Sequence, residues 1–268
     1  MEYVEYLRDR RILRNYAIVL LAGFVLGMAS LISGTHGTIR IQGTSHRGTI
    51  DVSGVLAACS FLTFIIATVV APGLAAQVST LAIAWTRPLS RAAVAWRFIV
   101  VDLAAIVTAY LMVLATVLLF VAVFHSLVTV QLQDTGSAAS LNDLMSVRFD
   151  APQMVAVAAR GFGCTLMWYG LVTLVSVRFP ERCGMIAGLS WVAFLVLGGL
   201  WNASFPPLIH GLIVALNYLN PIAYFGNFGS DVQQQIIPLS GTLRTLIAWC
   251  IGIAALAGTI RLWSTREV

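Results

Sequence analysis

Residues 98–124 read FIVVDLAAIVTAYLMVLATVLLFVAVF, and the only charged side chain among them is Asp102. A helix of about 20 apolar residues is long enough to cross a hydrocarbon core about 30 Å thick. A soluble chain of this length would instead gather its apolar residues into amphipathic stripes. The stretch therefore predicts a membrane-spanning helix.

The composition of the whole chain agrees with this stretch. The 268 residues are 59% hydrophobic and 10% charged, and the mean hydropathy is +0.89. Soluble domains have roughly 45–50% apolar and about 25% charged residues. The sixteen basic residues are all arginines that flank apolar runs and form no basic patch, which disfavours nucleic-acid binding. The composition predicts an all-α integral membrane protein.

Division of the chain at its polar clusters gives six candidate spans. They cover residues 16–33, 54–78, 98–124, 154–177, 184–201 and 242–262. The first run is followed by no small-x-small cleavage site, so we expect it to remain as a helix. We expect residues 16–268 to form a single six-span transmembrane domain. The four cysteines (Cys59, Cys164, Cys183 and Cys250) have no C-x-x-C spacing and are interpreted as thiols in or beside the spans.

The distribution of arginines predicts the orientation. With the N-terminus in the cytoplasm, eleven arginines face the cytoplasm and five lie outside or near the outer face. Those five are Arg40, Arg47, Arg148, Arg160 and Arg244. By the positive-inside rule, both termini are predicted to be cytoplasmic.

Two segments outside the spans have distinct compositions. Residues 1–15 mix tyrosines with arginines, which favours an amphipathic helix at the cytoplasmic headgroups, with a solvated tail as the alternative. Residues 203–240 contain a second apolar run that is too short to cross and is interrupted at Asn220-Pro221. We expect this segment to form a re-entrant helical hairpin in the outer leaflet.

The cytoplasmic connection between spans two and three carries the most informative sequence. Residues 77–97 read QVSTLAIAWTRPLSRAAVAWR. Pro88 ends the preceding helix, and Ser90 is suited to cap a new helix that runs toward Arg97. We expect a short cytoplasmic helix at about residues 86–97, just below the membrane.

This connection resembles the corresponding loop of the ABC-2 family of ABC transporter permeases. The matching residues are Ser79-Thr80-Leu81, the core Arg87-Pro88-Leu89-Ser90-Arg91, and Trp96-Arg97 at the start of the third span. Gln77 departs from the family, which usually has an acidic residue there. The six spans, the N-terminal helix and the hairpin also follow the family's layout.

The resemblance implies a division of labour between subunits in a bacterial cytoplasmic (inner) membrane. Two permease subunits, identical or homologous, would dimerise to form an export pathway among the lipids. Two copies of a separate ATPase subunit would bind ATP and Mg²⁺. The coupling residues would be Arg87, Pro88, Leu89, Ser90, Arg91 and Arg97. This chain would be non-catalytic and bind no cofactor, and it has no G-x-x-x-x-G-K-[ST] sequence.

Three residues are candidates for the pathway or for interhelical pairing: Asp102, Arg160 and His210. Ionisable groups within spans are costly and usually face protein or water. For Asp102 the alternative is pairing with Arg97 or Arg182 at the cytoplasmic interface, and for Arg160 it is snorkelling to the outer headgroups. No histidine has the spacing of a metal site.

Glycines in spans four and five predict close helix packing. They are Gly161, Gly163, Gly170, Gly184, Gly188, Gly198 and Gly199. Small residues at such spacing let membrane helices approach each other closely.

Other classes of membrane protein remain as alternatives. An ATP-independent secondary transporter would more often show inverted repeats and buried carboxylates. An intramembrane protease would need a nucleophile motif or a His-Glu-x-x-His sequence, and neither is present. The transported substrate and the choice between homodimer and heterodimer stay open.

Overall fold

The computed structural model describes part of the chain. The described residues are 48–51, 56–57, 60–61, 63–65, 90, 92–100, 102–104, 106–108, 110–111, 115, 129–131, 138–140, 145–148, 150–179, 182–200, 204–225, 237 and 239–265. The helices with defined bounds are α6 (Ala151–Arg178), α7 (Cys183–Leu200), α8 (Pro207–Asn217), α9 (Pro221–Phe225) and α10 (Gly241–Thr265). The strands are β1 (Gly48–Asp51), β2 (Thr129–Gln131), β3 (Ala138–Ser140) and β4 (Met145–Arg148).

Two of these helices, α6 and α10, are long and apolar enough to cross a membrane. At 1.5 Å per residue their 28 and 25 residues extend over about 42 and about 37 Å. Helix α6 begins after Asp150, whose carboxylate accepts a hydrogen bond from the Gln153 N–H at 3.2 Å. Arg178 lies in its last turn, where a cation is favourable to the helix dipole.

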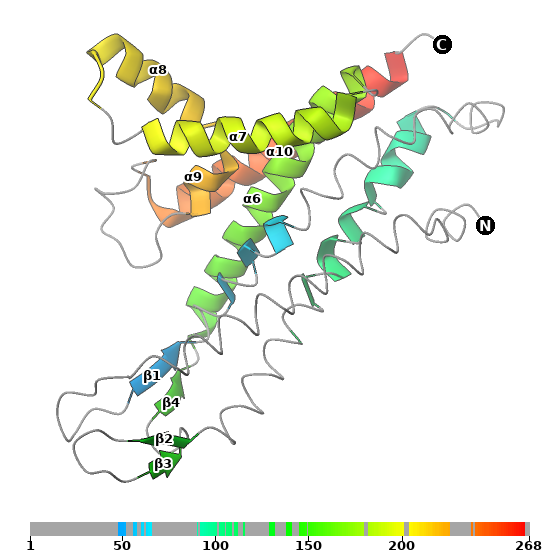
Figure 1. Ribbon diagram of the computed structural model, residues 1–268. Coiled ribbons are helices and arrows are strands. Elements are labelled where there is room, and N and C mark those ends of the chain that lie inside the picture. The colour runs from blue at the N-terminus through cyan, green and yellow to red at the C-terminus, as the bar shows by residue number, and fades with distance from the viewer. Residues whose placement is uncertain are drawn as a thin grey trace.

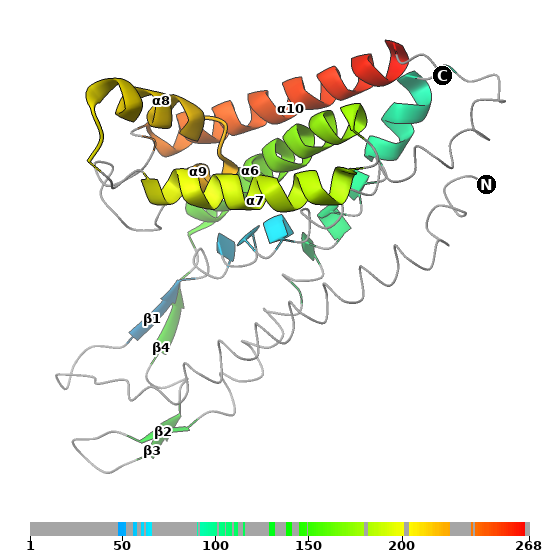
Figure 2. The ribbon, with the colours of Figure 1, turned by 45° about the horizontal axis from the view of Figure 1, so that its top comes forward.

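Helices α6 and α10 pack side by side and run in the same direction (Figures 1 and 2). Near the middle of the pair, a Cβ at Gly252 would lie 2.9 Å from the carbonyl carbon of Leu166, and one at Gly170 would lie 2.8 Å from the Gly252 oxygen. At the C-terminal ends, Val177 and Trp263 share a buried cluster. The two backbones are therefore in close contact at their glycines.

A further helical stretch packs against this pair in the opposite direction. Residues 92–100, 102–104, 106–108, 110–111 and 115 are helical. Val94 lies with Val177 at the C-terminal end of α6, whereas Tyr110 stacks edge to face on Phe162 with the ring centroids 5.0 Å apart. This stretch is therefore antiparallel to α6.

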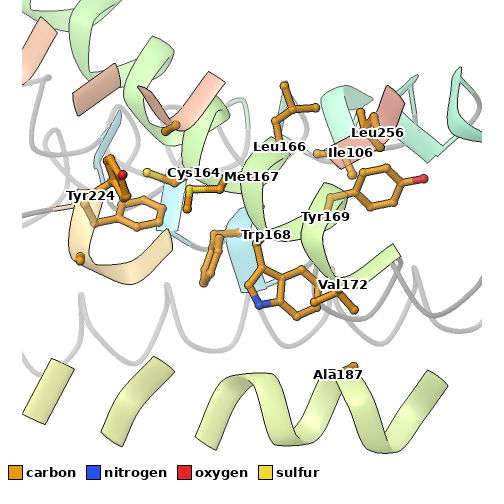
Figure 3. Close-up of a cluster of buried hydrophobic side chains, with 14 of the residues drawn as sticks. Ile106, Cys164, Leu166, Met167, Trp168, Tyr169, Val172, Ala187, Tyr224 and Leu256 are labelled. Atoms are coloured by element: carbon orange, nitrogen blue, oxygen red, sulfur yellow. The ribbon is translucent and has the colours of Figure 1, made fainter. Parts of the chain in front are cut away.

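The apolar core lies where α6 faces α7, α9 and the helical residues 56–57, 60–61 and 63–65. Figure 3 shows Trp168 on one side of α6, toward Ala187 of α7, and Tyr169 on another side, beside Ile106 and Leu256. The Phe64 ring packs edge to face on the Trp168 ring, with the ring centroids 6.1 Å apart, and belongs to the same buried cluster as residues of α6, α7 and α9.

Two short helices follow α7. Helix α8 ends at Asn217, and α9 begins at Pro221 after a tight turn that contains Asn220. This turn lies where the Asn-Pro sequence predicts one. Most of α8 is exposed, and Leu208 has 89% of its surface accessible.

Two connections far apart in the sequence are joined by a parallel pair of strands. Thr49 of β1 is the register partner of Ser146 of β4. Strands β2 and β3 form a separate antiparallel pair. Both pairs lie beyond the N-terminal end of α6 (Figure 1). The sequence analysis did not predict these strands.

The helical character of the predicted fold is confirmed for most of the described chain, and the four short strands are an addition to it. Helices α6, α7 and α10 correspond to the predicted stretches 154–177, 184–201 and 242–262, and α8 and α9 lie within the stretch 203–240. Residues 1–15 and the first predicted span, 16–33, lie outside the described residues.

Candidate functional site

Ser90 begins the helical stretch that leads toward Arg97. The Ala93 N–H donates to the Ser90 hydroxyl oxygen at 3.2 Å, and the Val94 N–H donates to the Ser90 carbonyl oxygen at 3.1 Å. A serine whose side chain accepts from the third residue of a helix is a favourable N-cap. The capping role predicted for Ser90 is confirmed.

The first turns of this helix have an exposed side and a buried side. Trp96 and Arg97 are exposed. On the other side, Val94 and Ala95 pack with Val177 and Trp263, at the C-terminal ends of α6 and α10. Because residues 92–100 are helical without a break, the helix continues past Arg97 into the predicted third span. The first turns of this helix therefore contact both α6 and α10 directly.

Arg87, Pro88, Leu89 and Arg91 lie outside the described residues. Of the predicted coupling residues, the structure places only Ser90 and Arg97. Both residues lie near the C-terminal ends of α6 and α10.

Asp102 lies one and a half turns beyond Arg97 on the same helical stretch and is only 2% exposed. The Tyr169 hydroxyl of α6 donates a hydrogen bond to its Oδ2 atom at 2.7 Å. Hydrogen bonds to a carboxylate are shorter and stronger than neutral ones, and a buried carboxylate needs such donors. This interaction connects the predicted third and fourth spans. Tyr169 was not among the predicted partners of Asp102.

Arg160 and Arg244 lie close together near the N-terminal end of α10. The Arg160 guanidinium contacts Gly241, the first residue of that helix. Arg244 follows one turn later and is 3% exposed. The Arg160 charge is near enough to act on Arg244, and both charges act on the buried Cys164. The structure therefore adds Arg244 to the predicted candidate Arg160.

His210 is half-buried on α8, which is a different helix from those that carry Asp102, Arg160 and Arg244.

The turn between α8 and α9 is held by two asparagines. Asn217 donates to the carbonyl oxygens of Ile213 at 3.0 Å and Leu197 at 3.2 Å, and Asn220 donates to that of Phe194 at 3.0 Å. Both asparagines are fully buried. They anchor the α8–α9 turn to the last turns of α7.

Tyr224 closes the same turn from α9. Its hydroxyl donates to the Tyr218 carbonyl oxygen at 2.8 Å, and burial raises the pKa of Tyr224 to about 12. The phenol thus stays protonated and acts as a donor at neutral pH.

Several of these residues were missed in the sequence for different reasons. Arg244 lies inside the apolar stretch 242–262, so the criterion that singled out Arg160 also applies to it. Asn217 and Asn220 are polar residues beside an apolar run, which is a weaker signal. Nothing in the sequence singles out Tyr169, because its role depends on its hydrogen bond to Asp102, which forms only when the two helices pack together.

The site has no grouping typical of a metal centre. Within the ranges that the structure describes, no three His, Cys, Asp or Glu side chains gather closely enough to hold a metal ion. No protein-family model, curated protein or solved structure matches this chain.

Proposed function

We propose that this chain is the membrane subunit of an ATP-driven ABC exporter and that a separate ATPase subunit drives it. One observation carries the proposal. The sequence Arg87-Pro88-Leu89-Ser90-Arg91 directly precedes a helix that Ser90 caps and that packs on the ends of α6 and α10.

The packing at this end gives a physical route for coupling. A displacement of the segment that contains residues 87–91 moves the helix that starts after Ser90. Val94 and Ala95 of that helix contact Val177 and Trp263, so the displacement reaches both long helices directly. Since well-packed interfaces are not continuously deformable, small shifts at one end are converted into a change of helix arrangement.

The directions of the helices support a six-span arrangement. Helix α10 is parallel to α6, and the stretch 92–115 is antiparallel to both. These are the directions that spans three, four and six have when the chain crosses the membrane at each predicted span. The β1–β4 pair supports the same arrangement, because β1 lies between predicted spans one and two and β4 lies between predicted spans three and four, both on the predicted outer side.

The exposed apolar surface supports a lipid environment for the α8–α9 hairpin. Leu208, Leu212 and Leu216 are all exposed on α8. Large apolar side chains on a short helix are unfavourable in water and favourable in the outer leaflet. A re-entrant position of this hairpin is part of the proposal.

The test is a reversal of charge at the coupling segment. The chain is expressed with a candidate free-standing ABC ATPase from the same genome, and the complex is purified into lipid nanodiscs. We expect Arg87→Glu with Arg91→Glu to abolish co-purification or to reduce ATP turnover by about tenfold or more. The reversed charges would repel the acidic groups of an ATPase surface that binds the two arginines, and such like-charge contacts oppose docking.

The control variant is Arg178→Glu with Arg261→Glu, which makes the same charge change on two exposed arginines predicted to face the cytoplasm. It should leave assembly and turnover close to those of the wild type. The proposal fails if the Arg87/Arg91 variant assembles and hydrolyses ATP as the wild type does, or if the control is equally impaired.

A further inference from the structure

Arg160 and Arg244 form a pair of neighbouring cations near the N-terminal end of α10. Their guanidinium groups are near enough to repel each other. In the part of the chain that the structure describes, no carboxylate forms an ion pair with either of them. Buried arginines are normally paired or hydrogen-bonded, because an isolated charge is costly to remove from water.

The donors of these two groups are also unused. The Nε and Nη1 atoms of Arg244 and the Nε atom of Arg160 are buried and have no hydrogen-bond partner. Arg244 is 3% exposed, so water at the surface does not reach most of its side chain. Three donor nitrogens on two guanidiniums are therefore buried without an acceptor among the residues that the structure describes.

The backbone adds to the positive potential at this position. Arg244 lies in the first turn of α10, and that turn contains no acidic residue. The N-terminal end of a helix carries a partial positive charge and favours anions. Here a buried arginine occupies that end, and Arg160 reaches Gly241 from the neighbouring helix.

The two arginines are held in position by the packing of their helices. The Trp249 indole N–H donates to the Ala159 carbonyl oxygen at 2.9 Å, and Trp249 also lies against Gly163. These contacts fix α10 against α6 within about one and a half turns of each arginine. Arg160 is only half-buried, so the pair is accessible from one side.

We propose that Arg160 and Arg244 form a binding site for a phosphate group. A phosphate offers several acceptor oxygens and up to two negative charges, and the planar forks of two guanidiniums match such oxygens better than two ammonium groups would. The source of the phosphate is a phospholipid headgroup or a soluble phosphate. The site does not depend on coupling to an ATPase.

The test measures the stabilisation of the purified full chain by phosphate-containing ligands. In a neutral detergent, phosphatidic acid and diacylglycerol with the same acyl chains differ only in the phosphate. We expect phosphatidic acid to raise the Tm and to remain bound in native mass spectrometry, and diacylglycerol to do neither, since a ligand that binds the folded state stabilises it. Inorganic phosphate, titrated separately, identifies a site that accepts soluble phosphate as well.

The matched variants are Arg160→Gln with Arg244→Gln and Arg178→Gln with Arg261→Gln. The second pair removes the same charge from the opposite ends of the same two helices, where both arginines are exposed. We expect the first pair to weaken phosphatidic acid binding by about tenfold or more and the second pair to leave it unchanged. Arg160→Lys with Arg244→Lys keeps both charges and should bind with an intermediate affinity.

The stabilisation of the wild-type chain by phosphate-containing ligands tests the proposal even if a variant fails to fold. The proposal is overturned if neither phosphatidic acid nor inorganic phosphate stabilises the wild type. It is also overturned if both glutamine variants lose binding equally. Stabilisation by phosphatidic acid alone supports a lipid source, and stabilisation by inorganic phosphate as well supports a site open to soluble phosphates.

Discussion

The hydrogen bond from Tyr169 to Asp102 is a polar interaction inside an apolar interface. Both side chains are buried, and the bond joins two helices through residues 67 positions apart in the sequence. A hydrogen bond to a charged group contributes about 1.5–3 kcal/mol. We expect Tyr169→Phe, which removes only the hydroxyl, to lower the free energy of unfolding by about that amount. The measurement is thermal or denaturant unfolding of the purified protein in detergent.

Thr173 provides a control one turn further along α6. Its side chain is fully buried, and its hydroxyl has no hydrogen-bond partner among the described residues. Thr173→Val removes this hydroxyl at nearly constant volume and should leave the stability unchanged or raise it by about 1 kcal/mol. If Tyr169→Phe is no more destabilising than Thr173→Val, the bond to Asp102 contributes nothing to stability.

At the scale of single residues, interactions between residues close in the sequence were predictable, and interactions between different helices were not. The cap at Ser90 depends on residues 90 to 94 alone, so the sequence was sufficient to predict it. The importance of Asp102 was also visible, since a carboxylate in an apolar run is unusual. Its partner Tyr169 was not visible, because the pairing depends on how two helices lie against each other.

Glycines determine the contact between α6 and α10. A Cβ at Gly252 would lie 2.9 Å from backbone atoms of both Leu166 and Met167. Backbone atoms have little freedom to move away, so Gly252→Ala forces the helices apart. We expect a loss of about 1–3 kcal/mol in the free energy of unfolding, which is the typical cost of overpacking. The change can be measured as a lower Tm.

Gly188 on α7 is the matched control. No described atom lies within 4 Å of a Cβ built at that position. Gly188→Ala therefore meets no steric obstacle and gains up to about 1 kcal/mol from the higher helix propensity of alanine. Equal destabilisation by the two variants would contradict the assignment of Gly252 to the helix contact.

The sequence predicted close packing for the glycines of spans four and five alike, and the structure separates them. Gly163 and Gly170 of α6 contact α10, whereas Gly184, Gly188 and Gly199 of α7 face open space within the described residues. The same residue type at similar spacing has different surroundings. The spacing of small residues shows where helices are able to approach, and the neighbouring helix decides where they do.

The parallel pair of β1 and β4 joins two segments that lie far apart in the sequence. Strands in a sheet lie about 4.8 Å apart, which is within the Cα separation of a disulfide. Thr49 and Ser146 are direct register partners. We expect Thr49→Cys with Ser146→Cys, in a chain whose four native cysteines are replaced by alanine, to form a disulfide under mild oxidation. A shift in gel mobility that is reversed by reductant detects it.

The control for this cross-link shifts the second cysteine by one residue. Successive side chains in a strand point to opposite faces, so Thr49→Cys with Val147→Cys places the thiols on different faces. That pair should cross-link slowly or not at all. Equal cross-linking of both pairs would show that the register observed between β1 and β4 is not maintained in solution.

At the scale of the molecule, the apolar runs predicted three of the well-described helices and the turn at Asn220-Pro221. This success has a simple cause, since a helix that spans a membrane must be long and continuously apolar. The strands were missed because they are three or four residues long, too short for an alternating pattern such as that of Met145–Arg148 to distinguish a strand from a loop. Short strands of this kind depend on partners distant in the sequence.

The glycine contacts of α6 and α10 limit how the two helices are able to move. A slide or rotation of one helix relative to the other would bring a side chain into the position that a glycine now occupies, against the facing backbone. The pair is therefore expected to move as a single rigid body. Its contacts with the helix that follows Ser90 include side-chain pairs such as Tyr169 with Asp102, so a rearrangement driven from that helix is expected to move α6 and α10 together.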